Sequence, residues 1–98
     1  MSTPYIINEH EILSMAIARF GLKNQTDLAI EEMSELITAL SHWHRNRIKG
    51  NAVCSEIADV IIMMRQLALY FGQDEVQAEI DRKLARLGQY LDSGEYVR

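Results

Sequence analysis

The chain has 98 residues, of which 48% are hydrophobic and 24% charged, and its formal net charge is −4. This length suits one small globular domain, and the acidic balance argues against a protein that grips the phosphates of a nucleic acid polymer. A helical chain of this size has little core of its own, so we expect a homodimer or homotetramer.

The cellular compartment is predicted from the cysteine content and from the absence of membrane-spanning and signal-peptide patterns. Cys54 is the single cysteine, which excludes an intrachain disulfide and fits a reducing environment. The most apolar run, residues 60–64, is far too short to cross a bilayer, and no basic segment leads into an apolar stretch as in a signal peptide. We therefore expect a cytoplasmic protein without membrane contact.

Four helices are predicted, because the only proline is Pro4 and glycines divide the remaining chain. The first helix covers residues 8–20, where apolar side chains recur every three or four positions, and Gly21 is a natural C-cap. The second begins near Thr26, a suitable N-cap, and continues to His44. Residues 45–51 are polar and predict a loop.

The third predicted helix runs from about Asn51 to Phe71. Its segment 60–64 is apolar nearly all round, which indicates burial on more than one face and a central place in the fold. The fourth begins near Asp74 and carries one apolar stripe, made of Val76, Ile80, Leu84, Leu87 and Leu91. Short connections favour antiparallel neighbours, so residues 1–98 are expected to form a single all-α domain, a compact bundle of about four helices.

Acidic residues lie at the edges of the apolar faces of the second and third predicted helices. Glu32 and Glu35 are three residues apart, as are Glu56 and Asp59, and Glu31 adjoins the first pair. At about 100° per residue, the three glutamates of the second helix fall within an arc of roughly 100°. Both groups therefore face the region where the two helices are expected to pack.

The pairing of the two helices can be tested by register. Facing residues in an antiparallel hairpin have numbers with a constant sum, and Glu32 with Asp59 has the same sum as Glu35 with Glu56. That sum places the turn centre between Arg45 and Asn46, whereas the predicted loop is centred near Ile48. The result is a mismatch of about one helical turn between the two helices, which an asymmetric loop absorbs. The register therefore supports one cluster of four carboxylates.

Carboxylates that meet between packed helices repel each other and lose hydration, which costs several kcal/mol per ion. Such a cluster persists only with a shared proton, basic partners or a cation. Oxygen ligands without a positioned histidine or cysteine suit Mg²⁺, or alternatively Mn²⁺. Magnesium also keeps coordination positions open, which phosphate oxygens of a substrate can take.

The motif Glu31-Glu32-x-x-Glu35, followed by Glu56-x-x-Asp59, resembles the signature of the all-α nucleoside triphosphate pyrophosphatase superfamily, which includes the MazG proteins and the dimeric dUTPases. The resemblance covers about residues 26–91. Within it, residues 80–87 are similar to the basic helix that follows in MazG-like chains.

This resemblance implies an enzyme that hydrolyses a nucleoside or deoxynucleoside triphosphate to the monophosphate and pyrophosphate, in house-cleaning or nucleotide-pool control. Glu31 would act as an auxiliary acid that positions the attacking water, and Lys83 and Arg86 would approach the triphosphate. The implied Mg²⁺ ligands are Glu32, Glu35, Glu56 and Asp59.

Three alternatives stay open. The acids could decorate a solvated surface, or form a non-catalytic module that binds a metal or a basic partner. A carboxylate-bridged di-iron or di-manganese bundle is disfavoured, because that class uses Glu-x-x-His motifs, which the chain lacks. Lys83 and Arg86 also fit a solvated charged stripe.

The remaining notable side chains have structural interpretations. We expect Trp43 in core packing or an oligomer contact rather than under a base, and Cys54 as a small buried residue. His42 and His44 point to opposite faces of one helix, so they cannot share a metal. Core filling is predicted for Met33, Met63 and Met64, and structural ion pairs for Arg65 and Arg82.

Overall fold

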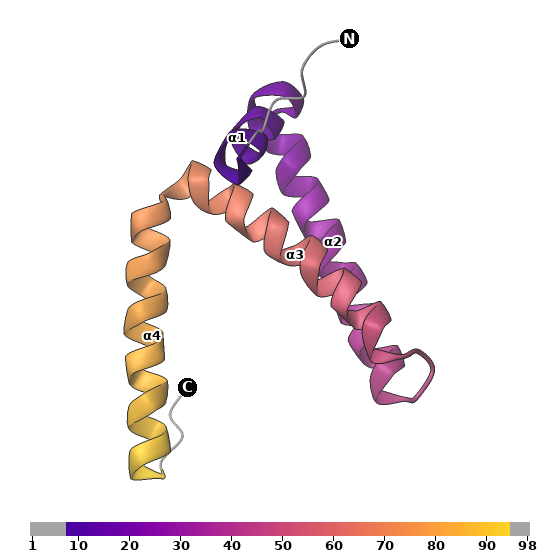
Figure 1. Ribbon diagram of the computed structural model, residues 1–98, viewed down its shortest axis with the longest axis vertical. Coiled ribbons are helices and arrows are strands. Elements are labelled where there is room, and N and C mark those ends of the chain that lie inside the picture. Colours follow the sequence, from indigo (N-terminus) through magenta and orange to yellow (C-terminus); the bar gives the residue numbers. More distant parts are fainter. Residues whose placement is uncertain (1–7, 95–98) are drawn as a thin grey trace.

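The computed structural model describes residues 8–94, and all regular structure within this range is helical (Figure 1). The elements are α1 (Glu9–Phe20), α2 (Leu22–His44), α3 (Gly50–Phe71) and α4 (Gln73–Ser93). The predicted all-α class and the four helices are therefore confirmed.

Helix α1 has the ends that its sequence predicts. The side chain of Asn8 accepts a hydrogen bond from the backbone N–H of Glu11 at 2.9 Å, which caps the first turn. At the other end, the N–H of Gly21 donates to the carbonyl of Ile17 at 2.9 Å. Gly21 has φ of 87°, a conformation that favours glycine.

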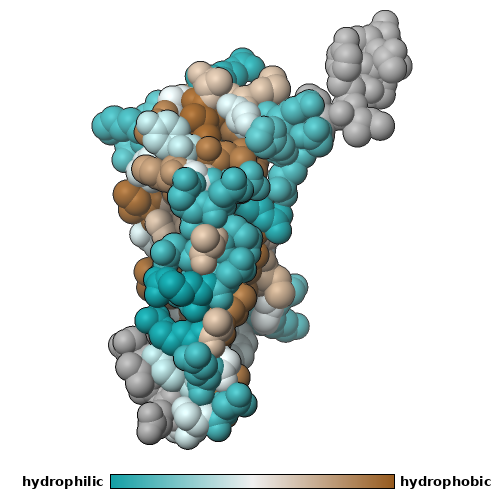
Figure 2. Space-filling view, turned by 90° about the vertical axis from the view of Figure 1, so that its left-hand side faces the viewer, coloured by the Kyte–Doolittle hydropathy of each residue, from teal (hydrophilic) through white to brown (hydrophobic). Residues whose placement is uncertain are grey.

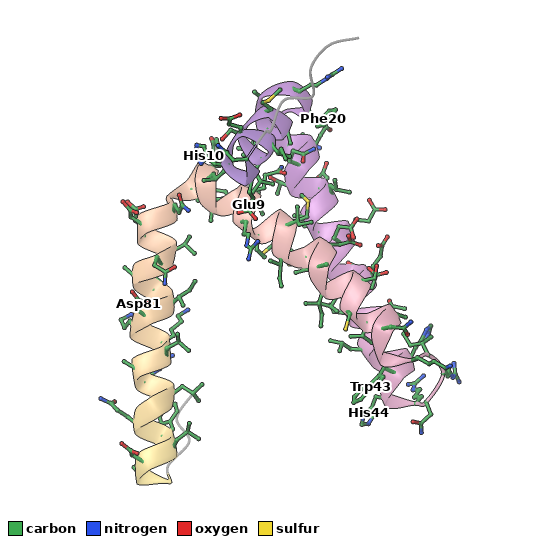
Figure 3. All side chains as sticks on the ribbon, in the orientation of Figure 1. Glu9, His10, Phe20, Trp43, His44 and Asp81 are labelled. Atoms are coloured by element: carbon green, nitrogen blue, oxygen red, sulfur yellow. The ribbon has the colours of Figure 1, made fainter. Side chains whose placement is uncertain are left out.

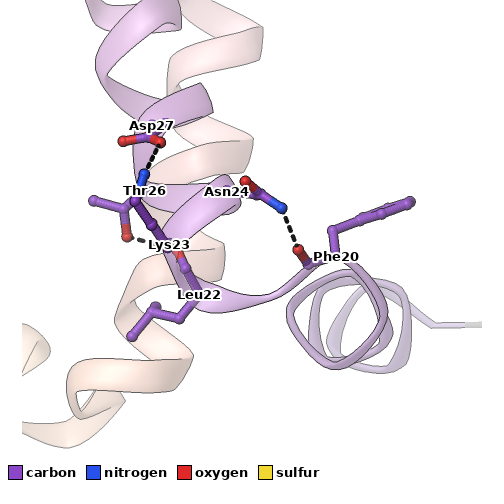
Figure 4. A network of polar contacts seen from close by, with 6 residues as sticks. All are labelled: Phe20, Leu22, Lys23, Asn24, Thr26 and Asp27. Carbon is purple, nitrogen blue, oxygen red and sulfur yellow. Dashed lines mark hydrogen bonds and ion pairs between the residues drawn. The ribbon is translucent and has the colours of Figure 1, made fainter.

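Helix α2 begins at Leu22, one turn before the predicted start, so the expected N-cap at Thr26 was wrong. The Thr26 hydroxyl donates to the carbonyl of Leu22 at 2.8 Å, inside the helix (Figure 4). The side chain of Asn24 donates to the carbonyl of Phe20 at 2.9 Å and ties the extra turn to the end of α1. Only Gly21 separates the two helices.

The connection between α2 and α3 covers residues 45–49, two residues fewer than predicted. Asn46 takes the left-handed conformation there, with φ of 60°, which asparagine tolerates better than most residues. Helix α4 ends at Ser93, and the following residue, Gly94, forms a left-handed C-cap with φ of 73° and ψ of 6°.

Helices α2 and α3 form an antiparallel hairpin, and α1 packs across the end of this hairpin opposite the loop (Figure 1). Helix α4 contacts only α3, at their shared junction. The predicted central place of α3 is confirmed, because α3 contacts each of the other three helices. The buried apolar side chains come from α1, α2 and α3 and are Leu13, Ala29, Ala39, Val53 and Met63.

A buried hydrogen bond joins the two arms of the hairpin. The amide of Gln66 donates to the side-chain carbonyl of Gln25 at 2.6 Å, and both residues are buried. Each amide group satisfies part of the other's hydrogen-bonding capacity, which makes their burial tolerable. This pair is the polar link in the described part of the α2–α3 interface.

Within one chain the helices do not close into the compact bundle that short connections predicted. Helix α4 has no buried residue, and the radius of gyration is 17.4 Å, whereas a compact chain of 100 residues has about 13 Å. The face of α4 that looks away from the hairpin is mostly hydrophilic (Figure 2). Its apolar stripe lies on the other side, where no helix of the same chain covers it.

Several core predictions fail for the same reason. The segment 60–64 is not buried on more than one face, since Ile61 and Ile62 are 42% and 49% exposed. Of the three methionines predicted to fill the core, only Met63 is buried, and Met33 and Met64 lie at the surface. These side chains lack cover because α4 leaves α3 instead of folding back along the hairpin.

The glutamine pair can be tested by a double-mutant cycle. We expect Gln66→Met alone to lower the free energy of unfolding by about 1–3 kcal/mol, because it strands the buried carbonyl of Gln25. Gln25→Met together with Gln66→Met should recover much of this loss. Urea unfolding followed by circular dichroism measures both. Losses that simply add would show that the two side chains do not act as a pair.

Candidate functional site

Carboxylates from both arms of the hairpin meet at its centre. One oxygen from each of Glu32, Glu35 and Glu56 lies within 4.8 Å of the others. Glu32 and Glu35 are one turn apart on α2, and Glu56 comes from α3. The structure thus brings together three of the four predicted metal ligands, with Glu35 and Glu56 close across the hairpin as the register required. We refer to these three residues as the glutamate cluster.

The two other predicted acids lie beside the glutamate cluster. Asp59 is exposed and not part of the close group, but its charge is near enough to Glu32 to raise the pKa of that carboxyl group. Glu31 is exposed and lines a cavity next to the cluster. All five predicted acids therefore belong to one acidic region.

The glutamate cluster is electrostatically strained. One oxygen of Glu32 and one of Glu56, the Oε2 atom in each, are buried and have no hydrogen-bond partner within residues 8–94. The pKa of Glu32 is raised above its ordinary 4.5, chiefly by burial and then by the charges of Glu35, Asp59 and Glu56. The fold therefore favours either a proton or a positive charge at this position.

Basic side chains of the same chain do not relieve this strain. In the described range, the ion pairs join Lys23 to Asp27, Arg65 to Glu9 and Arg82 to Glu79, and none involves the glutamate cluster. The structural ion pairs predicted for Arg65 and Arg82 are thereby confirmed. Of the possible ways to neutralise the cluster, a shared proton and a bound cation remain.

A cavity of about 410 Å³ opens beside the glutamate cluster, which is large enough for a small ligand. Glu31, Glu35 and Glu56 line one end of it. Ser34 lies between Glu31 and Glu35 along α2, and the remainder, toward the loop, is lined by Thr38, Ala39, His42, Ile48 and Ala52. We call this cavity the hairpin groove.

The histidines behave as their helical phase predicts. His42 is half-buried in the hairpin groove, whereas His44 is exposed and does not line it. No binding role was predicted for His42. Its seven-residue spacing from Glu35 was the signal for its place in the groove, because seven residues make almost two whole helical turns.

Two side chains predicted to be buried within the chain, Trp43 and Cys54, are exposed. Trp43 lies at the loop end of the hairpin and is 52% exposed, so it does not pack in the core of the chain (Figure 3). An oligomer contact, the other predicted use of Trp43, stays a prediction. Cys54 is exposed rather than buried, because its position on α3 faces away from α2 and α1.

The two basic residues predicted to approach the triphosphate lie on α4. Helices α2 and α4 do not contact each other, and neither Lys83 nor Arg86 lines the hairpin groove. Lys83 instead lines a separate cavity at the α3–α4 junction, next to Phe71 and Ile80. Within one chain these side chains are therefore not assembled with the acids.

The raised pKa of Glu32 predicts how stability depends on pH without divalent cations. The native chain holds the Glu32 proton more tightly than the unfolded chain, so the free energy of unfolding should fall as pH rises above about 4.5. Glu32→Gln should flatten this decline, and Glu31→Gln, at an exposed neighbouring position, should leave it in place. Urea unfolding in EDTA at pH 4.5 to 7 provides the comparison. Equal slopes in all three proteins would rule out Glu32 as its source.

Comparison with known proteins found no matching protein-family model, no matching curated protein and no matching solved structure. The resemblance to the all-α nucleoside triphosphate pyrophosphatases therefore stays a prediction from motif spacing. None of the helices described in residues 8–94 combines the length and apolar character needed to cross a membrane.

Proposed function

We propose that the chain is a Mg²⁺-dependent nucleoside triphosphate pyrophosphohydrolase, with Mn²⁺ as an alternative ion. One observation carries the proposal. Carboxylates from two helices converge within 4.8 Å, with two buried oxygens that lack hydrogen-bond partners in the described range, beside a groove that can hold a small ligand. The motif spacing adds the resemblance to enzymes of this reaction class.

The residues present fit a hard divalent cation. Carboxylate oxygens are the ligands that Mg²⁺ and Mn²⁺ prefer, and the unpartnered oxygens of Glu32 and Glu56 are still free to bind. Glu35 and Asp59 would complete the set. A bound ion would offset the repulsion within the glutamate cluster and neutralise charge on a triphosphate.

The chain's own residues would then position the reactants. Glu31, exposed at the groove, would accept a hydrogen bond from the attacking water and orient it toward a phosphorus atom. Attack forms one P–O bond and breaks another, which yields the nucleoside monophosphate and pyrophosphate. Alignment and charge neutralisation dominate such reactions, so a rigid hairpin that holds several carboxylates suits them.

We further propose that the chain works as a homodimer or homotetramer. Large apolar side chains of all four described helices are exposed, among them Phe20 at 54%, Ile37 at 69% and Phe71 at 67%, and a stable interface buries about 800 Å² per partner. The exposed stripe of α4, with Leu91 78% exposed, would supply much of this interface with a second copy.

An assembly would also give Lys83 and Arg86 their predicted role. Because α4 of the same chain stays clear of α2, these side chains would reach a bound triphosphate only from the α4 helix of another copy. Lys83 borders the apolar stripe, so an α4 helix seated on a neighbouring hairpin would bring its charge to the edge of the contact.

Pyrophosphate release from a panel of natural and modified NTPs and dNTPs tests the reaction directly. We expect release with Mg²⁺ or Mn²⁺ and none in EDTA. Glu35→Gln combined with Asp59→Asn should lower kcat at least about 100-fold, because the acids that bind the ion are lost. Glu11→Gln combined with Asp27→Asn removes the same charge outside the groove and should retain activity.

If folded protein released no pyrophosphate from any nucleotide of the panel, the proposed enzymatic activity would be refuted. If Mg²⁺ still raised the melting temperature beyond the effect of ionic strength, the cluster would remain as a metal-binding module without catalysis. A characteristic iron absorption band after aerobic iron loading would instead point to the di-metal alternative.

The oligomer is tested at the apolar stripe of α4. We expect Leu84→Glu to weaken self-association more than tenfold, because burying a leucine contributes about 1.5–3 kcal/mol and a buried charge adds a penalty. Ala85→Glu lies on the opposite side of the same helix and serves as the control. Sedimentation equilibrium measures both, and a wild-type chain that stays monomeric at tens of micromolar would contradict the proposal.

A further inference from the structure

The hairpin groove extends well beyond the acids. Along α2 it follows one stripe of the helix, from Glu31 through Thr38 to His42. Glu35 and His42 are separated by about 10 Å along the helix axis. Along this stripe the acids come first, with the Ser34 hydroxyl between Glu31 and Glu35, and the Thr38 hydroxyl and the His42 imidazole follow. A ligand that fills the groove must change its chemistry in the same order.

The two hydroxyl groups of the groove, Ser34 between the acids and Thr38 beyond them, can only accept hydrogen bonds from a ligand. Ser34 Oγ donates to the carbonyl of Ile30 at 2.9 Å, and Thr38 Oγ1 donates to the carbonyl of Ser34 at 3.1 Å. Each hydroxyl has one hydrogen, which these bonds use, so only oxygen lone pairs remain. The middle of the groove therefore favours a ligand with hydrogen-bond donors, such as the hydroxyls of a sugar.

The loop end of the groove is lined by apolar side chains and one imidazole. His42 is half-buried there, beside Ile48 from the loop and the small apolar residues Ala39 and Ala52. A flat imidazole among apolar side chains offers both a stacking surface and a ring nitrogen for hydrogen bonding. This combination suits a flat aromatic heterocycle with polar edges, which is the chemistry of a nucleobase.

We infer that the nucleoside half of the substrate lies along Thr38 and His42, with its sugar hydroxyl donating to Thr38 Oγ1 and its base against the imidazole of His42. This inference rests on the proposed function, because the acids at the other end must hold the phosphates. The order of the acids, Thr38 and His42 along α2 then matches the order of phosphates, sugar and base. His42 and Thr38 are binding residues that select for a nucleotide over bare polyphosphate.

Calorimetric titration in Mg²⁺ separates the two halves of the groove. The probes are α,β-imido analogues of the four common deoxynucleoside triphosphates, their 2′,3′-dideoxy counterparts, and tripolyphosphate. We expect His42→Ala to weaken the nucleotide analogues at least about fivefold and to leave tripolyphosphate unchanged. Thr38→Val should weaken the deoxy analogues about 3–10-fold but not the dideoxy ones.

Two matched variants control for indirect effects. His44→Ala removes the exposed histidine of the same turn. Thr26→Val removes a hydroxyl that bonds the carbonyl four residues earlier, as Thr38 does, but outside the groove. Both should leave every affinity unchanged.

The outcomes distinguish this inference from the enzyme itself. Nucleotide hydrolysis with affinities untouched by His42→Ala and Thr38→Val would overturn the nucleoside site and leave the hydrolase. The expected affinity pattern without hydrolysis would support the nucleoside site and reject the hydrolase. If the variants weakened tripolyphosphate as much as the nucleotide analogues, or if the wild type bound no probe, the nucleoside site would be overturned.

Discussion

The repulsion among carboxylates at the α2–α3 interface is the constraint on which the rest of this structure depends. Glu32 and Glu56 each hold an oxygen out of contact with water and without a hydrogen-bond partner in the described range. Such an arrangement is unfavourable unless a proton or cation compensates it, and it persists because packing elsewhere in the hairpin is favourable. A fold that tolerates this cost is poised to bind positive charge.

Near the acids the two helices of the hairpin pack through small residues, and toward the α1 end a buried hydrogen bond joins them. Ala29 and Ala39 are buried on either side of the glutamate positions, so the helices can approach closely without filling the groove. At the end covered by α1, the hydrogen bond between Gln25 and Gln66 links the two arms. The site is thus held on two rigid helices, which is what precise positioning of a substrate requires.

The apolar stripe of helix α4 is not covered by the other described helices of the same chain. The large apolar side chains of this stripe are exposed, and large apolar side chains of α2 and α3, such as Ile37 and Ile62, are exposed as well. A small chain gains stability mainly by burying apolar area, so a second copy is the natural source of the missing cover. Under that arrangement, one contact would complete the core and bring the basic residues of α4 toward the acids.

Helical periodicity in the sequence predicted the helical elements and the shared face of Glu32 and Glu35, because both are local properties. The register of an antiparallel hairpin predicted in addition that Glu56 of α3 lies near Glu35. The sequence by itself could not determine the start of α2, since a threonine hydroxyl can either cap a helix or bond within it, as Thr26 does. The groove around His42 likewise required the loop to place Ile48 beside α2. Only the tertiary structure decided where α4 lies, because an apolar stripe shows that a face needs cover but does not specify which surface covers it.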